Sequence, residues 1–246
     1  MNNSTIVLLR PRKENDPTIH TYDWAEKAYK MMKSYGYTVI DIKKNEVTYN
    51  NVTKSLQYYR PRLVVTFSHG CPSSIQGQSE CVITRKFDID ELLNMPNLRE
   101  IIKPLIYSSG CVNTCLAMPD ICNPLCMNET NVNLLKDTIV FTVACYSASQ
   151  LGKCAIRYGA EVYSGYTDLM LFPVDSIHSQ DIFRDIHLVF LKALLEGKTV
   201  GEAEYDMNRY EDAVIKFYKK TKYVSLPALW NKLHRNVLGN KNARMF

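Results

Sequence analysis

The chain lacks the features that would assign it to a membrane, to a nucleic acid or to a nucleotide. No stretch approaches the roughly 20 apolar residues that a membrane-spanning helix requires. The phosphate-binding patterns G-x-G-x-x-G and G-x-x-x-x-G-K-[ST] are absent. The formal net charge of +5 comes from scattered Lys and Arg rather than from a basic block, and the first residues do not form a secretory signal. We therefore expect a soluble, cytoplasmic protein with neither a membrane nor a nucleic acid as its partner.

Disulfide-rich and disordered classes are also poorly matched. Eight cysteines in 246 residues are too few for a small disulfide scaffold, and 46% hydrophobic residues with 22% charged residues exclude wholesale disorder. We expect one domain over residues 1–246, with a Cys-rich insertion at about 109–133. Pro119 and Pro124 forbid regular structure through this insertion.

Strand and helix patterns alternate along the chain, which predicts an α/β fold: a three-layer αβα sandwich with a mostly parallel central sheet. Leu63–Phe67 and Thr138–Val143 are wholly apolar, as expected for central strands that are buried on both faces. Further strands are predicted at 6–9, 37–42 and 161–165, with a strand or turn at 237–239. Helices are predicted at 22–35, 52–59, 147–158, 180–195, 200–218 and 226–233.

A histidine and a cysteine follow the two central strands. His69 comes just after the first, and Cys145 just after the second. Since parallel neighbouring strands end at the same edge of a sheet, the two side chains are expected to meet there. A thiolate is a nucleophile, and an imidazole within reach can take its proton. The pair is therefore a candidate catalytic dyad.

The residues around the dyad fit acyl transfer. Cys145 precedes the helix predicted at 147–158, whose positive dipole end would favour the thiolate. Gly70 has no Cβ, so a substrate backbone can approach it closely. The N–H groups of Gly70 and Cys145 are candidate donors of an oxyanion hole. Taken singly, a cysteine beside apolar residues is most often an inert core residue, and a histidine after a strand is most often a satisfied polar group.

Several segments resemble the clan CD cysteine peptidases, which include caspases, legumain, clostripain, gingipains, separase and CHAT domains. The similarity is greatest to the gingipain and CHAT branch and covers positions from about 60 to 240. The matching segments are Phe67-Ser68-His69-Gly70, Val143-Ala144-Cys145-Tyr146-Ser147-Ala148, Leu151-Gly152, Tyr158-Gly159-Ala160, Tyr163-Ser164-Gly165-Tyr166, and Leu229-Trp230-Asn231-Lys232-Leu233 through Asn236-Val237-Leu238-Gly239-Asn240. The last segment departs from the clan, because Asn240-Lys241 stands where Asp-Pro is common.

The resemblance implies a caspase-like αβα sandwich and a cysteine endopeptidase that needs no cofactor for catalysis. It assigns the nucleophile to Cys145 and the general base and acid to His69, with a peptide or protein as substrate. The separation between the two is longer than in most clan members, and the Cys-rich insertion accounts for the excess. Clan members select the residue before the scissile bond, and several hold Arg or Lys there with an acidic group. Asp168 is the candidate for that role here, since a carboxylate accepts a guanidinium fork; the alternative is a solvated loop aspartate.

Four cysteines form a cluster of their own. Cys111, Cys115, Cys122 and Cys126 have the spacing Cys-x3-Cys-x6-Cys-x3-Cys. Four thiolates at such a spacing can surround a structural zinc ion, although zinc fingers commonly place two residues between the members of a pair. Two disulfides or four free thiols are the alternatives.

Two other functions compete with the peptidase. A caspase-like module could bind peptides or partner proteins with a vestigial dyad, although the intact His69 and Cys145 argue against this. An unrelated doubly wound domain could bind a small ligand at the sheet edge, but no phosphate-binding motif supports it.

Overall fold

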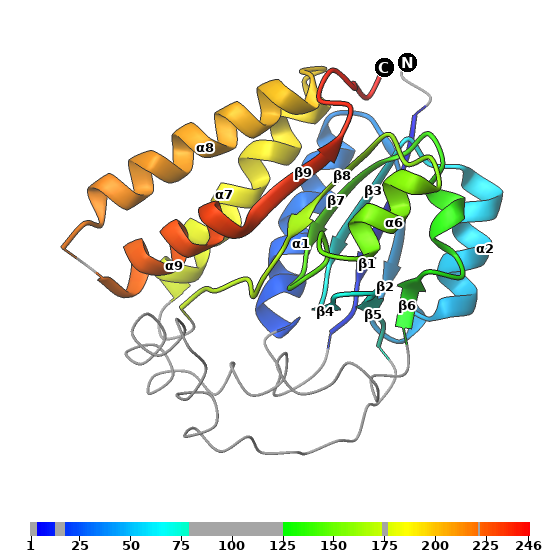
Figure 1. The fold of residues 1–246 in the computed structure, drawn as a ribbon, viewed down its shortest axis with the longest axis horizontal. Coiled ribbons are helices and arrows are strands. Elements are labelled where there is room, and N and C mark those ends of the chain that lie inside the picture. The colour runs from blue at the N-terminus through cyan, green and yellow to red at the C-terminus, as the bar shows by residue number, and fades with distance from the viewer. Residues whose placement is uncertain (1–3, 13–17, 79–124, 174–176, 221) are drawn as a thin grey trace.

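The computed structural model describes residues 4–12, 18–78, 125–173, 177–220 and 222–246. A six-stranded sheet with the order β2-β1-β3-β7-β8-β9 lies at its centre (Figure 1). Strand β9 is antiparallel to β8, and the other neighbours are parallel. The strands are β1 (Thr5–Arg10), β2 (Thr38–Lys43), β3 (Leu63–Phe67), β7 (Ile139–Val143), β8 (Val162–Tyr166) and β9 (Arg235–Gly239).

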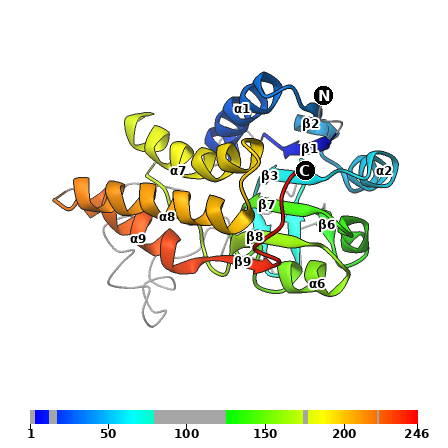
Figure 2. The ribbon, with the colours of Figure 1, turned by 90° about the horizontal axis from the view of Figure 1, so that it is seen from above.

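Helices cover both faces of this sheet. Figure 2 shows α1 and α7 on one side, with α8 and α9 beyond α7, and α2 and α6 on the other side. The helices are α1 (Thr18–Ser34), α2 (Tyr49–Tyr59), α6 (Leu151–Arg157), α7 (Ile177–Leu195), α8 (Val200–Phe217) and α9 (Lys222–His234). The predicted αβα sandwich with a mostly parallel sheet is therefore confirmed, and the architecture is caspase-like.

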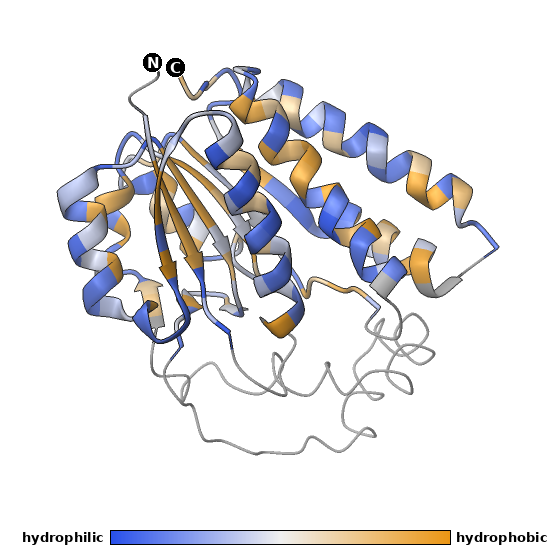
Figure 3. Cartoon of the chain, turned by 180° about the vertical axis from the view of Figure 1, so that it is seen from behind, coloured by the Kyte–Doolittle hydropathy of each residue, from blue (hydrophilic) through white to orange (hydrophobic). Residues whose placement is uncertain are grey.

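The alternation of side chains along each strand divides the core in two. In β1, Ile6 and Leu8 face the core beneath α1 and α7, whereas Val7 and Leu9 face the core beneath α2 and α6. All five residues of β3 and all five of β7 are buried, which explains why their sequences are apolar apart from one threonine in each. The central strands accordingly form the most hydrophobic part of the chain (Figure 3).

A second, smaller sheet begins directly after β3 in the chain. It consists of β4 (Gly70–Cys71), β5 (Ser74–Gln76) and β6 (Leu125–Asn128), paired antiparallel in that order. Part of the segment predicted as an insertion at 109–133 has regular structure: residues 125–128 form β6, and the 3-10 helix η2 (Val132–Leu135) follows with Val132 and Leu135 buried. The bounds of the insertion stay a prediction. Residues 109–124 lie outside the described part of the chain.

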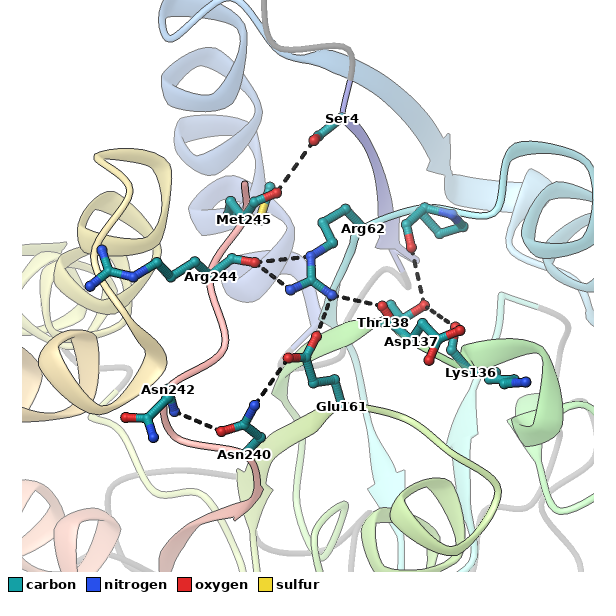
Figure 4. Close-up of polar contacts among 11 residues, drawn as sticks. Ser4, Arg62, Lys136, Asp137, Thr138, Glu161, Asn240, Asn242, Arg244 and Met245 are labelled. Carbon is teal, nitrogen blue, oxygen red and sulfur yellow. Dashed lines mark hydrogen bonds and ion pairs between the residues drawn. The ribbon is translucent and has the colours of Figure 1, made fainter.

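Arg62 ties the C-terminal segment to the amino-terminal edge of the sheet (Figure 4). Its guanidinium donates to the carbonyl of Arg244, to the carbonyl of Asp137 and to the carboxylate of Glu161. Ser4 adds a hydrogen bond from its hydroxyl to the carbonyl of Met245 at 3.4 Å. The two ends of the described chain thus meet at the edge opposite the carboxyl ends of the parallel strands.

None of the described helices combines the length and the apolar character needed to cross a membrane.

Candidate active site

The sheet register places His69 and Cys145 side by side at its carboxyl edge. Strands β3 and β7 are adjacent and parallel, and Phe67 pairs with Val143 at their ends. His69 and Cys145 are each the second residue after these partners. The two residues therefore leave the sheet at the same level on neighbouring strands, as the sequence predicted.

The two chain segments also contact each other one residue further along, at Gly70. A Cβ built on Gly70 would lie 2.1 Å from the carbonyl oxygen of Cys145 and 3.1 Å from the Cβ of Ala144. No side chain fits at such a distance, so glycine is required for the segment after His69 to lie against Cys145. His69 and Cys145 are both mostly buried, each with 7% of its surface exposed.

The chain turns sharply just after the cysteine. Tyr146 has a φ of +54°, a left-handed conformation that costs energy for a residue with a Cβ. The turn is held from inside by Ser147, which is fully buried and donates its hydroxyl to the carbonyl of Ala144 at 2.8 Å. The same hydroxyl accepts the backbone N–H of Tyr166 at 3.3 Å, which joins the turn to the end of β8.

The prediction that Cys145 lies at the start of a helix was wrong. Helix α6 begins at Leu151, and a series of turns separates it from the cysteine. The N–H groups of Gln150 and Leu151 donate to the carbonyl of Pro72 at 3.1 and 2.8 Å. The carbonyl of Pro72, in the β4–β5 hairpin, therefore occupies the N-terminal end of α6, where the Cys145 thiolate was expected.

A backbone amide, rather than a helix end, contacts the sulfur of Cys145. The N–H of Met170 donates to the Sγ of Cys145 at 3.3 Å. A hydrogen bond to the charged form of an ionisable group favours that form, so this contact favours the thiolate. Nothing in the sequence points to Met170, because an apolar side chain gives no sign that its own backbone contacts the site.

Asp168 lies in the same segment as Met170. Its carbonyl accepts the N–H of Tyr146 at 2.9 Å, so it is adjacent to the residue after the nucleophile. Its carboxylate already has two neighbours: Oδ1 accepts the N–H of Leu169 at 2.7 Å, and Oδ2 lies 3.8 Å from the Nδ1 of His234. The structure thus brings Asp168 to the site and also shows interactions that a substrate side chain would have to share.

Helix α9 holds this segment from outside. The indole N–H of Trp230 donates to the carbonyl of Leu169 at 3.0 Å. The side chain of Asn231 accepts from the N–H of Leu171 at 2.8 Å and donates to the carbonyl of the same residue at 2.6 Å. Both residues belong to a segment that resembles the clan CD peptidases, but the resemblance assigned them no role at the site.

Beneath the turn that follows Cys145, Tyr166 contacts the buried His187. The Tyr166 hydroxyl lies 2.7 Å from Nε2 of His187, whose Nδ1 lies 2.6 Å from the carbonyl of Phe183. The carbonyl can only accept, so Nδ1 carries the proton and Nε2 accepts from the tyrosine. Complete burial lowers the pKa of His187 to about 3 because the imidazolium would lose its hydration there. His187 is therefore neutral and supports the packing of β8 against α7.

Of the four clustered cysteines, only Cys126 is in the described part of the chain. It lies in β6 as a fully buried free thiol whose Sγ is 3.5 Å from the carbonyl of Ile75 and 3.4 Å from that of Gln76. Burial raises its pKa to about 12. Cys111, Cys115 and Cys122 lie outside the described residues, so the zinc, disulfide and free-thiol alternatives for the cluster all stay predictions. Metal analysis with thiol titration, with and without reductant, distinguishes them.

Comparison with solved structures gives a fold relative. The chain is similar to the crystal structure of the Arg-specific cysteine proteinase gingipain R, with a TM-score of 0.55 and 13% sequence identity. The match covers 98% of this chain and 47% of that one, so this chain spans about half the length of the gingipain R chain. At this identity the likeness shows a shared fold, which agrees with the clan-level resemblance. No protein family matches the chain by sequence, and no curated protein does.

Proposed function

We propose that this chain is a cysteine endopeptidase in which Cys145 is the nucleophile and His69 the general base and acid. One observation carries the proposal: the paired ends of β3 and β7 bring His69 and Cys145 to the same edge, with Gly70 in contact with the Cys145 carbonyl. The fold shared with a cysteine proteinase supports it.

The proposed reaction follows from these groups. His69 takes the proton of the Cys145 thiol, and the thiolate attacks the carbonyl carbon of the scissile peptide bond. The N–H groups of Gly70 and Cys145 are the proposed donors to the oxyanion that forms. His69 then gives its proton to the leaving amine, and water hydrolyses the thioester to release the acid product. No step requires a cofactor.

A peptide library tests the assignment directly. Purified protein is incubated with the library, and cleavage sites are identified by mass spectrometry with wild type, Cys145→Ala and His69→Ala. We expect cleavage by wild type only, while circular dichroism shows all three proteins folded. Cys154, half-buried on α6, supplies a matched control, because Cys154→Ala is expected to retain cleavage.

Alkylation provides a readout that does not depend on finding a substrate. Iodoacetamide is expected to modify Cys145 ahead of the other thiols, since the thiolate is the reactive form. No cleavage by wild type, together with equal labelling of wild type and Cys145→Ala, would contradict the proposal and favour a module that binds peptides without cleaving them.

We further propose that the peptidase prefers a basic residue before the scissile bond, with Asp168 as its acceptor. The position of Asp168 beside Tyr146 supports this, as does the Arg specificity named for gingipain R. Reporter peptides with Arg, Lys, Asp or Leu at that position test it. Wild type is expected to favour Arg and Lys, and Asp168→Asn is expected to lose that preference. Equal cleavage of all four peptides would contradict it.

A further inference from the structure

The segment 167–171, which directly follows β8, contacts both Cys145 and the residue after it. Met170 donates its N–H to the sulfur of Cys145 at 3.3 Å, and the Asp168 carbonyl accepts the N–H of Tyr146 at 2.9 Å. A single shift of this segment would therefore move both contacts together.

The segment lies beyond the main sheet, because β8 ends at Tyr166. Besides its contacts with Cys145 and Tyr146, it makes hydrogen bonds to the end of α9. Thr167 donates its N–H to the carbonyl of His234 at 2.7 Å, and Leu169 accepts from the indole of Trp230 at 3.0 Å. The position of the segment is thus set by a helix that follows it by some 60 residues.

Asn231 makes the tightest of these attachments. Its amide binds both the N–H and the carbonyl of Leu171, at 2.8 and 2.6 Å, and 2% of its surface is exposed. The N–H of Leu171 belongs to the peptide group that starts at Met170. Restraining this peptide restrains the orientation of the Met170 backbone, whose own N–H points at the sulfur.

We propose that Asn231 is a positioning residue of the proposed peptidase: by fixing the peptide group after Met170, it aims the Met170 N–H at Cys145 and so stabilises the thiolate. This inference rests on Cys145 being the nucleophile. The side chain of Asn231 binds the backbone of Leu171, so it acts on the sulfur through the segment 167–171.

The test measures the pH dependence of iodoacetamide alkylation at Cys145, with the labelled peptide quantified by mass spectrometry. Asn231→Leu keeps a side chain of similar size and removes both hydrogen bonds to Leu171. Losing an aligned donor disfavours the thiolate, so we expect the midpoint of the alkylation profile to move up by about one pH unit. Alkylation near neutral pH becomes slower accordingly.

Asn131 supplies a matched control on the other side of the molecule. It is also buried, and its amide also bridges two backbone groups, accepting from the N–H of Asn128 at 2.9 Å and donating to the carbonyl of Cys126 at 3.0 Å. Asn131→Leu is expected to cost similar thermal stability and to leave the alkylation midpoint of Cys145 unchanged.

Trp230→Phe is a second variant, which removes the bond to Leu169 and retains an aromatic ring. It is expected to shift the midpoint in the same direction by less, and it decides the matter if Asn231→Leu does not fold. An unchanged midpoint in the folded variants, or an equal shift in Asn131→Leu, overturns the inference. The midpoint can be measured even if no peptide is cleaved, so failure of the proposed function has a different signature.

Discussion

At the scale of single residues, the candidate site depends on two unusual backbone positions. Gly70 lies where a Cβ would meet the Cys145 carbonyl at 2.1 Å, and Tyr146 has a φ of +54° directly after the cysteine. The close approach at Gly70 and the sharp turn at Tyr146 bring the ends of two strands into one site. The left-handed backbone of Tyr146 costs conformational energy, which the surrounding packing compensates.

Gly70→Ala is expected to impair activity more than stability. The new methyl group forces the segment after His69 away from Cys145, which displaces a proposed oxyanion donor. Cleavage should fall by about 100-fold or more, while the free energy of unfolding falls by about 1 to 3 kcal/mol. Steady-state kinetics and urea unfolding measure the two effects.

Gly36→Ala is the matched control for this substitution. Gly36 has a φ of +81° with no atom within 4 Å of the position of its Cβ, so alanine there adds backbone strain alone. It should lower stability and leave cleavage per folded molecule unchanged. Equal loss of activity in both variants would contradict the role given to Gly70.

At the scale of elements, the amino-terminal edge of the sheet is organised by one side chain. Arg62 precedes β3 and binds groups that come just before β7, just before β8 and after β9 (Figure 4). The arginine therefore links three strands to the C-terminal segment, on the edge opposite the dyad.

Arg62→Met should destabilise the protein without affecting the site. Hydrogen bonds to charged groups contribute about 1.5 to 3 kcal/mol each, but partial exposure of both Arg62 and Glu161 reduces the effect, so we expect a total near 2 kcal/mol. Urea unfolding measures it, and hydrogen exchange should increase at residues 243–245. Glu161→Gln should have a smaller effect, because the bonds to the two carbonyls persist. Unchanged exchange in Arg62→Met would contradict this account.

The same scale shows what the sequence could predict. The bounds of β3 were predicted correctly because a run of β-branched and apolar residues, interrupted only by Thr66, is typical of a strand buried on both faces. The start of α8 was also correct, since Thr199 and Glu202 form a capping box next to it. In both cases the deciding interactions are local or follow from burial alone.

Predictions failed where distant parts of the chain decide the conformation. Helix α6 was expected to start at 147, but the turn after Cys145 is stabilised by Tyr166 and the helix start by the carbonyl of Pro72. Strand β4 has only two residues, too few for a periodic pattern. His69, Cys145 and Gly70 could be found as candidates because they follow strands. Met170 could not, because its contact with Cys145 is made by its backbone, and the segment containing Asn231 resembled the clan without indicating its contact with Leu171.

At the scale of the whole molecule, the buried His187 makes stability depend on pH. Its pKa is lowered to about 3 in the folded protein, while the unfolded chain has the usual value near 6.5. Between these values the unfolded chain binds a proton that the folded protein does not. The stabilising contribution is therefore complete above about pH 6.5 and is lost as the pH falls toward 3, by about 1.4 kcal/mol per unit.

His187→Gln removes the titration and retains a group that can bind the Tyr166 hydroxyl. Between pH 6.5 and 4.5, wild type should lose about 2 to 3 kcal/mol more stability than this variant, as measured by urea unfolding at both pH values. His178, exposed on the same helix, is the control, and His178→Gln should follow the wild-type profile. Parallel losses in wild type and His187→Gln would contradict this account.

The meeting of Ser4 with Met245 has a practical consequence for handling the protein (Figure 4). A tag or surface linker attached next to either residue starts from the pole of the molecule opposite Cys145, so an immobilised sample presents the carboxyl edge of its sheet to solution. A short peptide joining the two positions would close the chain into a ring without crossing that edge.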